Sequence, residues 1–336
     1  MTIGQAVMSD INSDEVSEAT YDVLVRQVTW EADGVLSLLL VDPDGRELPS
    51  WEPGAHIDLI LPSGLIRQYS LCGDIADRFS YRVGVLNDPN SRGGSKEIHE
   101  SSLIGKHLTV RGPRNHFHLS HDEGFVFIAG GIGITPMLPM ISEAERRGTP
   151  WRLIYGSRSR STMAFVDEIS KRRGGTVDLV PEDELGYPNF DTILGEVPPS
   201  SAVFTCGPPA MLAAVEARAT KYLSDNMLHL ERFTAPEGSV SPELTGDDDV
   251  FECVLARKGV TITVTPDRTL LRAIRDVIPS ILYSCEEGYC GTCEVKVLEG
   301  IPDHRDTILS DEEREANKSM MVCVSRSKSP RLVLDL

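Results

Sequence analysis

The chain has 336 residues, with 33 Lys and Arg against 51 Asp and Glu, and therefore a formal net charge of −18. Nucleic-acid binding relies on clustered basic side chains that displace counterions, so this charge excludes a nucleic acid as the expected partner. The sequence contains no apolar run of bilayer length, and residues 1–20 hold acidic but no basic side chains, unlike a secretory leader.

Residues 1–20 are expected to form a flexible N-terminus of a cytoplasmic protein without a membrane partner. Residues 21–120 then show short runs of alternating apolar and polar residues, separated by turn signals. This pattern predicts a small antiparallel β-barrel. The runs are Tyr21–Val28, Gly34–Val41, His56–Leu61, Phe79–Leu86 and His107–Arg111.

Two polar segments of this barrel carry groups that suit a flavin. Arg67 and Tyr69 fall on one side of a strand, where the guanidinium suits a phosphate and the phenol ring suits stacking on an isoalloxazine. Ser70 is placed to reach the N5 edge of such a ring. Gly93-Gly94-Ser95 precedes a short helix predicted at Lys96–Ser101, and glycine-rich backbone at a helix start suits an anion. Taken alone, the two segments also fit an exposed strand face and an ordinary loop.

Residues 121–234 alternate buried strand-like runs with segments of helical composition, which predicts a parallel α/β sheet. After the first run, Gly130, Gly131 and Gly133 lead into a helix whose N-terminus suits a diphosphate. Their pattern differs from the G-x-G-x-x-G dinucleotide fingerprint, and a plain strand-to-helix turn is the alternative. The predicted strands are Phe125–Ala129, Trp151–Tyr155, Val177–Val180 and Ala202–Thr205.

Two further turns in this region point to a nicotinamide nucleotide. Cys206-Gly207-Pro208 follows a buried strand at the carboxyl edge, where open α/β sheets bind ligands, so both glycine turns are expected to border one cleft. Cys206 suits a place beside the nicotinamide ring, and a packed turn residue is an equal alternative. At the end of the second strand, Ser157, Arg158 and Arg160 suit a 2′-phosphate, which leaves NADPH open beside NADH.

Residues 235–249 are rich in Pro, Gly, Ser and acidic residues, which predicts a linker before a last domain at 250–336. That domain opens with strand-like runs at Phe251–Arg257 and Val260–Thr265, followed by helical apolar spacing over Thr269–Val277.

Four cysteines of the last domain indicate an iron–sulfur cluster. Cys285, Cys290 and Cys293 have the C-x4-C-x2-C spacing of plant-type ferredoxins, with Cys323 as a distant fourth ligand of a [2Fe–2S] cluster. Glycines inside the loop allow the backbone to approach the cluster closely. Structural zinc is the alternative, but zinc sites usually arrive as two short-spaced ligand pairs. The chain is therefore expected to handle electrons one at a time.

The order of these motifs resembles that of the phthalate dioxygenase reductase family, which includes vanillate demethylase reductases. The motifs are R-x-Y-S, R-G-G-S, G-P-R-N-x-F, G-G-I-G-I-T-P, C-G-P, E-R-F and C-x4-C-x2-C…C. The resemblance implies a multidomain fold, with an FMN-binding antiparallel β-barrel, an NAD-binding α/β domain and an α+β ferredoxin domain of the β-grasp type. It also implies FMN rather than FAD and favours NADH. Residues implied to contact FMN are Arg67, Tyr69, Ser70, Gly93, Gly94, Ser95, Thr135 near its phosphate side and Phe233 over its ring.

We therefore expect the reductase component of a multicomponent oxygenase of the Rieske type, in which electrons pass from NADH through FMN to the cluster and on to the oxygenase. An NADPH-dependent reductase for a cytochrome P450 or another haem acceptor is the first alternative. A redox-sensing interaction module without enzymatic activity is the second. Acidic residues of the last domain, among them Glu286 and Glu287, are expected either to steer docking or only to maintain solubility.

Overall fold

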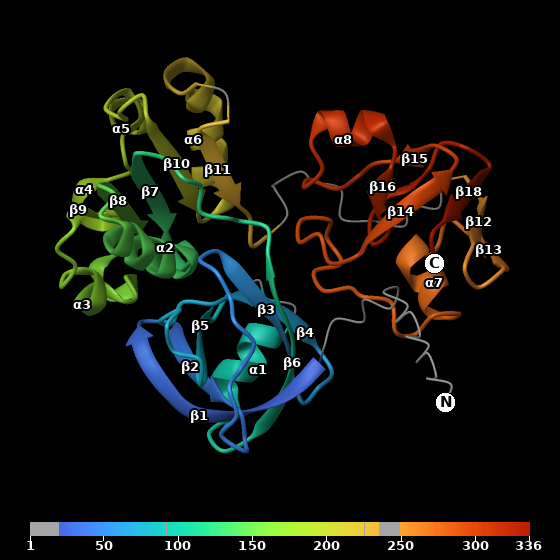
Figure 1. Ribbon diagram of the computed structural model, residues 1–336, viewed down its shortest axis with the longest axis horizontal. Coiled ribbons are helices and arrows are strands. Elements are labelled where there is room, and N and C mark those ends of the chain that lie inside the picture. Colours follow the sequence, from blue (N-terminus) through green and yellow to red (C-terminus); the bar gives the residue numbers. More distant parts are fainter. Residues whose placement is uncertain (1–19, 90, 92, 225, 235–248) are drawn as a thin grey trace, which may run out of the picture.

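A computed structural model describes residues 20–89, 91, 93–224, 226–234 and 249–336, which form three main sheets (Figure 1). The predicted flexible segment 1–20, apart from Thr20, and the predicted linker 235–249, apart from Asp249, lie outside the described residues. None of the helices in the described part combines the length and the apolar composition needed to cross a membrane.

The first sheet is an antiparallel barrel with the strand order β4-β3-β6-β1-β2-β5. An isolated bridge between Leu71 and Val83 joins the two outer strands and closes the barrel. Alternate residues such as Val23 and Val25 point inward and are fully buried, as the period-two pattern predicts. The elements are β1 (Thr20–Ala32), β2 (Val35–Val41), β3 (Ala55–Ile60), β4 (Ile66–Ser70), β5 (Ser80–Leu86), α1 (Gly94–Glu100) and β6 (His107–Asn115).

The second sheet is parallel throughout, with the order β11-β10-β7-β8-β9. Its central strand β7 (Gly124–Gly130) is buried on both faces and therefore consists almost entirely of apolar residues. The strand order reverses between β7 and β10, the point at which such sheets bind ligands. The other elements are η1 (Gly131–Gly133), α2 (Ile134–Arg147), β8 (Trp151–Ser157), η2 (Arg160–Thr162), α3 (Val166–Ile169), β9 (Gly175–Pro181), α4 (Glu182–Leu185), α5 (Phe190–Gly195), β10 (Ser201–Cys206), α6 (Pro209–Tyr222) and β11 (Leu228–Glu231).

The third sheet, in the C-terminal domain, has the order β13-β12-β18-β14-β16, with β18 parallel to β12 and antiparallel to β14. The side chain of Thr269 caps α7 by accepting a hydrogen bond from the Arg272 amide, so the predicted helix begins where its sequence suggests. The elements are β12 (Phe251–Leu255), β13 (Val260–Val264), α7 (Leu270–Arg275), β14 (Glu294–Glu299), β15 (Pro302–Asp303), α8 (Asp311–Ala316), β16 (Ser319–Met321), β17 (Arg326–Ser327) and β18 (Arg331–Leu334).

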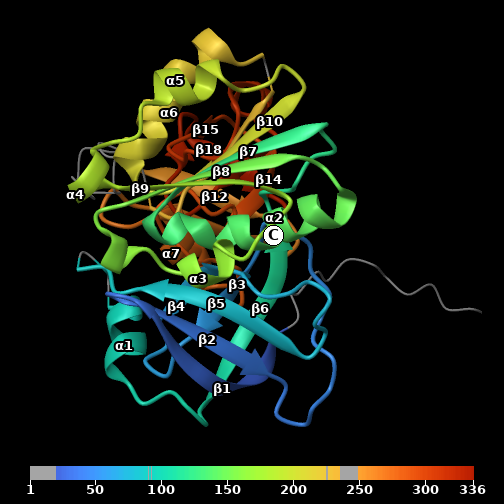
Figure 2. The ribbon, with the colours of Figure 1, turned by 90° about the vertical axis from the view of Figure 1, so that its left-hand side faces the viewer.

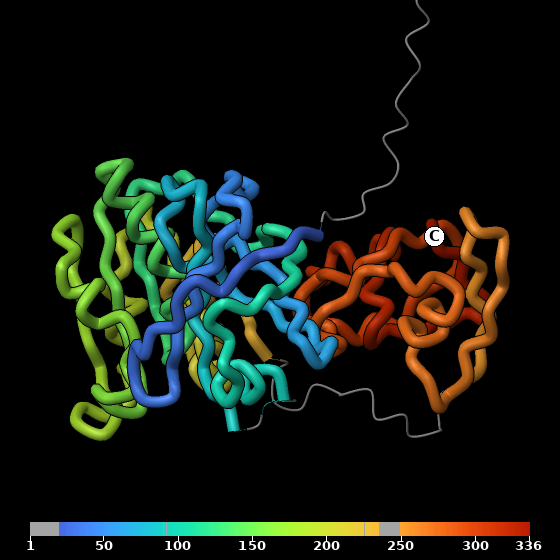
Figure 3. The backbone as a smooth tube through the Cα atoms, turned by 90° about the horizontal axis from the view of Figure 1, so that it is seen from below, coloured from blue at the N-terminus to red at the C-terminus, as the bar shows by residue number. Residues whose placement is uncertain are grey.

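The barrel packs against both other domains, on different faces. Toward the α/β domain, Ala32, Val35 and Cys72 join the same apolar cluster as residues of α2 and β7, and α2 lies between the parallel sheet and the barrel (Figure 2). Toward the C-terminal domain, the barrel presents β3 and β6, and Figure 3 shows the two domains side by side. The barrel is therefore the element through which the other two domains are positioned.

Candidate cofactor sites

The four predicted cluster ligands meet in one buried place. Cys285, Cys290 and Cys293 lie in the loop between α7 and β14, and Cys323 lies between β16 and β17. The Cys285 thiol contacts those of Cys290 and Cys323, and Cys323 also contacts Cys293. In addition, the backbone amide of Glu287 donates to Cys285 Sγ at 3.3 Å, the type of contact that supports a bound cluster.

The loop around these thiols fits a two-iron cluster. Gly288 and Gly291 have φ angles of 74° and 76°, and a Cβ on Gly288 would lie 2.6 Å from Val324 Cγ2, so only glycine suits this tight wrap. Four thiols in successive contact suit a cluster that shares four thiolates between two irons.

The protonation of these thiols depends on the metal. The neighbouring Cys285 thiol and burial raise the pKa of Cys290 well above its usual value. Without iron, the Cys290 side chain is therefore a neutral thiol at neutral pH. Because only thiolates bind iron, cluster assembly has to release protons from this site.

The two predicted flavin segments come together in the barrel although they lie apart in the sequence. Arg67, Tyr69 and Ser70 lie on β4, and a Cβ on Gly94 would lie 2.5 Å from Arg67 Cγ, so the start of α1 rests against this arginine. The hydroxyls of Ser70 and Ser95 are buried without a well-formed hydrogen bond. Buried polar groups normally have partners, so these hydroxyls fit a polar ligand such as FMN between the two segments.

The glycines of the predicted nucleotide turn have separate roles. A Cβ on Gly130 would lie 2.6 Å from Pro208 Cδ, and one on Gly133 would lie 2.2 Å from the Cys206 carbonyl oxygen. Both glycines are therefore needed where this turn packs against the turn after β10. Gly131 has a φ of 52°, and a Cβ added to it would have nothing within 4 Å, so this glycine faces open space. The structure thus brings the two predicted nucleotide turns together at the sheet's switch point.

Ser157 and Arg158 lie at the end of β8, as the sequence predicts, with different surroundings. The Ser157 hydroxyl lies 2.8 Å from Thr162 Oγ1, and Arg158 is exposed. Arg160, the second basic residue of this segment, forms an ion pair with Glu184 at 2.9 Å. Because that partner neutralises Arg160, the NADPH alternative depends chiefly on Arg158.

Glu231 is a residue of this region to which the sequence motifs assigned no role. It pairs with Cys206 across β10 and β11 and lies near Ser70, so side chains of two domains meet where β4 faces the nucleotide turns. Burial raises the pKa of Glu231 to about 8, and it raises the pKa of Cys206 well above its usual value. Glu231 is the first residue of the E-R-F motif, but only Phe233 of that motif was assigned a role from the sequence. Phe233 packs against the apolar cluster that the barrel and the α/β domain share.

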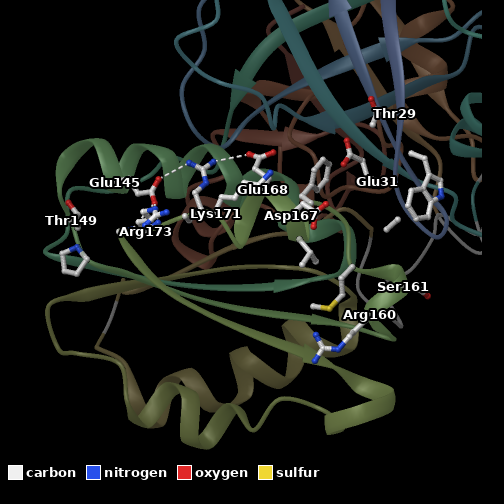
Figure 4. A pocket seen from close by; sticks show the side chains of 18 of the residues that line it. Thr29, Glu31, Glu145, Thr149, Arg160, Ser161, Asp167, Glu168, Lys171 and Arg173 are labelled. Atoms are coloured by element: carbon white, nitrogen blue, oxygen red, sulfur yellow. Dashed lines mark hydrogen bonds and ion pairs between the residues drawn. The ribbon is translucent and has the colours of Figure 1, made fainter.

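A cavity of about 1370 Å³ has Arg160 in its lining but none of the other residues assigned above (Figure 4). It is bordered by the end of β1 at Trp30, by Thr149 and Gly174, which precede β8 and β9, and by Phe165 next to α3. Within it, Arg172 bridges Glu145 at 3.0 Å and Glu168 at 3.2 Å. Its charges are largely paired with each other, and we assign it no cofactor.

Comparison with known proteins identifies a family model within the C-terminal domain and relatives that match nearly the whole chain. Residues 254–328 match the family described as 2Fe-2S iron-sulfur cluster binding domain. Phenoxybenzoate dioxygenase subunit beta from Ectopseudomonas oleovorans is 42% identical over 321 residues, which cover 95% of this chain and 98% of that protein. The solved structure of phthalate dioxygenase reductase, described as a modular structure for electron transfer from pyridine nucleotides to [2Fe–2S], matches with a TM-score of 0.69 and 33% identity, covering 94% of this chain and 98% of that one.

A second solved structure shows the same fold inside a longer protein. An intact type IV self-sufficient cytochrome P450 monooxygenase matches with a TM-score of 0.84 and 39% identity. The match covers 94% of this chain but 41% of that one, so this chain corresponds to less than half of that protein.

Three features together define a modular flavin and iron–sulfur oxidoreductase. They are a barrel with buried hydroxyls at β4 and α1, a parallel sheet with paired glycine turns, and a domain that carries the four cysteines. The chain belongs to the phthalate dioxygenase reductase family. The predictions of fold class, of an oxidoreductase and of FMN, NAD(H) and a [2Fe–2S] cluster as cofactors are confirmed at this level. The alternative of a sensing module without enzymatic activity is thereby set aside.

Proposed function

We propose that this chain is the cytoplasmic reductase component of a Rieske-type oxygenase system and passes electrons from NADH through FMN to the cluster. One observation carries this proposal: the cysteine loop lies directly against the barrel that holds the predicted flavin residues. Ser284, next to Cys285, donates a hydrogen bond of 2.9 Å to Asp58 on β3, the strand paired with β4. The route from flavin to cluster therefore needs no further protein.

The proposal includes the domain limits and the individual contacts. We assign 21–120 to the FMN domain, 121–234 to the NAD domain and 250–336 to the ferredoxin domain. When bound, FMN supplies the conversion of a two-electron hydride donor into single electrons for the cluster. The assigned residues are Arg67, Tyr69, Ser70, Gly93, Gly94, Ser95, Thr135 and Phe233 for FMN; Gly130, Gly131, Gly133, Ser157, Arg158, Cys206, Gly207 and Pro208 for the nucleotide; and Cys285, Cys290, Cys293 and Cys323 for the cluster.

The chain's own residues contribute placement and proton control. The open position at Gly131, at the start of η1 and α2, is suited to receive the diphosphate of the nucleotide. A nucleotide held there would have its nicotinamide near Cys206 and Ser70, where the two domains meet. Glu231, whose pKa is raised to about 8, holds a proton at neutral pH and would keep a negative charge away from that place.

The partner assignment is tested by reconstitution. The purified chain, loaded with FMN and cluster, is mixed with candidate Rieske-type oxygenases, and product formation is measured with NADH and with NADPH. We expect turnover with NADH and at least one such oxygenase. Rapid reduction of the chain's own cluster without transfer to any Rieske protein would contradict the partner assignment while leaving the internal electron route intact.

A reductase for a cytochrome P450 is the second candidate, and the similarity to the self-sufficient P450 monooxygenase favours it. In that protein the matching part lies within one longer chain. The same reconstitution with a P450 in place of the oxygenase separates the two candidates, because only the true acceptor should be reduced at low micromolar concentration.

A further inference from the structure

A buried cluster of charges lies on the barrel face that meets the C-terminal domain. Asp58 on β3 has no exposed surface and forms ion pairs with Arg111 at 3.1 Å and with Arg114 at 2.8 Å, both from β6. The side chains of the two arginines are 8% and 11% exposed, so the whole group is removed from water. We call these three residues the Asp58 triad.

The Asp58 triad contacts the cysteine loop at two places, before Cys285 and between Cys290 and Cys293. Before Cys285, Arg111 donates to the Tyr283 carbonyl at 2.7 Å and Ser284 donates to Asp58 at 2.9 Å. Farther along the loop, Arg114 donates to Thr292 Oγ1 at 3.4 Å, and the Cys290 thiol contacts the same oxygen at 3.3 Å. One hydroxyl therefore separates the Arg114 guanidinium from a predicted cluster ligand.

We propose that the Asp58 triad docks the cluster loop on the barrel and that the Arg114 guanidinium, separated from Cys290 by one hydroxyl, favours the reduced cluster. This inference rests on the proposed function and assigns the triad a positioning role. Reduction adds one negative charge to the cluster, and buried charges at this range interact more strongly than charges in water.

Burial of these charges is not explained by stability alone. A buried ion pair costs desolvation energy, and apolar side chains of similar size often stabilise such a site at least as well. The triad instead provides directional contacts to a carbonyl and two hydroxyls of the cysteine loop. These contacts fix the orientation of the loop, which apolar packing specifies less strictly.

Two substitutions of opposite charge test the proposal. Arg114→Gln removes a positive charge beside the cluster, and Asp58→Asn removes a negative one. In redox titrations monitored by EPR, we expect the midpoint potential of the cluster to shift negative in Arg114→Gln and positive in Asp58→Asn. A shift of the same sign in both variants, or no shift in either, would overturn the electrostatic part, because loss of structure alone does not depend on the sign of the charge removed.

Stopped-flow reduction by NADH tests docking in the same two variants. Bleaching of the flavin reports the first step, and appearance of the reduced-cluster spectrum reports the second. We expect the second step to slow by more than about tenfold in both variants, with the first step unchanged. An unchanged second step would overturn the docking role.

Controls separate this inference from folding defects and from the proposed function itself. Arg46→Gln removes an exposed arginine that pairs with Asp42 on the same barrel, and it should change neither step. Each variant is first required to hold FMN and cluster at wild-type stoichiometry. Arg114→Lys keeps the positive charge, so its potential should lie closer to the wild-type value than that of Arg114→Gln. If the wild-type chain shows no cluster reduction by NADH, the proposed function fails rather than the triad.

Discussion

The barrel meets its two neighbours through interfaces of opposite character. Toward the α/β domain it contributes Ala32, Val35 and Cys72 to a shared apolar cluster. Toward the C-terminal domain it presents the ion-paired Asp58, Arg111 and Arg114, which form hydrogen bonds with the cysteine loop, and the apolar clusters of those two domains contain no common residue. A shared core makes the first pair of domains one rigid unit, whereas a polar contact resembles interfaces between domains that separate. On the proposed function, hydride transfer, which needs close contact of two rings, would take place at the apolar interface.

The strongest effect should come from removing the electron exit without touching either interface. Cys290→Ser should abolish cluster absorbance and reduction of any protein acceptor, while NADH still bleaches the flavin, because the proposed flavin residues lie in the barrel. Cys253→Ala is the matched control, since Cys253 is an equally buried thiol of the same domain on β12. Cluster loss in the control but not in Cys290→Ser would contradict the ligand assignment.

The apolar interface is disrupted most simply at Gly84. A Cβ at this position of β5 would lie 2.7 Å from Thr135 Cγ2, so Gly84→Ala should push the α/β domain away from the barrel. We expect flavin bleaching by NADH to slow by about tenfold or more, with the cluster spectrum unchanged. Gly73→Ala is the control, because its Cβ would meet Arg82 at an ordinary 3.4 Å. Equal rates in both variants would show that this contact does not set the hydride geometry.

Glu231 gives the apolar side of the barrel a pH dependence. Its pKa is raised from 4.5 to about 8 in the folded protein, so between these two pH values the folded state keeps a proton that the unfolded chain has lost. The stabilisation that protonated Glu231 contributes to the free energy of unfolding is therefore fully present at pH 4.5 and below, and it is lost as the pH rises through 8. Denaturant unfolding should show a steeper fall in stability between about pH 5 and about pH 8 for the wild type than for Glu231→Gln. Parallel curves would contradict the assignment.

A smaller effect is expected at the outer face of the C-terminal domain. If the acidic first turn of α8 steers the partner, neutralising Asp311, Glu312 and Glu313 should lower kcat/KM for the acceptor by about threefold at low ionic strength and leave it unchanged at high salt. Neutralising Asp44, Glu47 and Glu52, which are exposed acids of the barrel, provides the control. Equal effects of the two sets would favour a role of the α8 acids in solubility alone.

Local signals in the sequence predict most of the fold. The alternation of apolar residues at His56–Leu61 corresponds to β3, and the buried run Phe125–Ala129 corresponds to β7, because inward-facing positions repeat along each strand. β11 was not predicted, since its four half-buried residues at the edge of the sheet carry no period of their own. The cluster can also be predicted from the sequence, because three of its four ligands, Cys285, Cys290 and Cys293, lie within a few residues of one another.

Contacts between domains were less predictable. Arg111 ends the predicted strand run His107–Arg111 and Arg114 follows it, and their partners Asp58 and Thr292 are distant in the chain. No local pattern encodes such a pairing. The sequence predicts a phosphate role for Gly133 but not its packing role. A Cβ on Gly133 would collide with the Cys206 carbonyl, because β7 and β10 lie side by side in the sheet.

An anaerobic titration with NADH, followed by absorbance and EPR in one sample, shows whether electrons leave the flavin through the cluster. We predict that flavin absorbance bleaches and that a reduced [2Fe–2S] signal rises in the wild type, whereas Cys290→Ser bleaches without the signal. Bleaching without a cluster signal in both proteins would contradict an electron route from the flavin to Cys285, Cys290, Cys293 and Cys323.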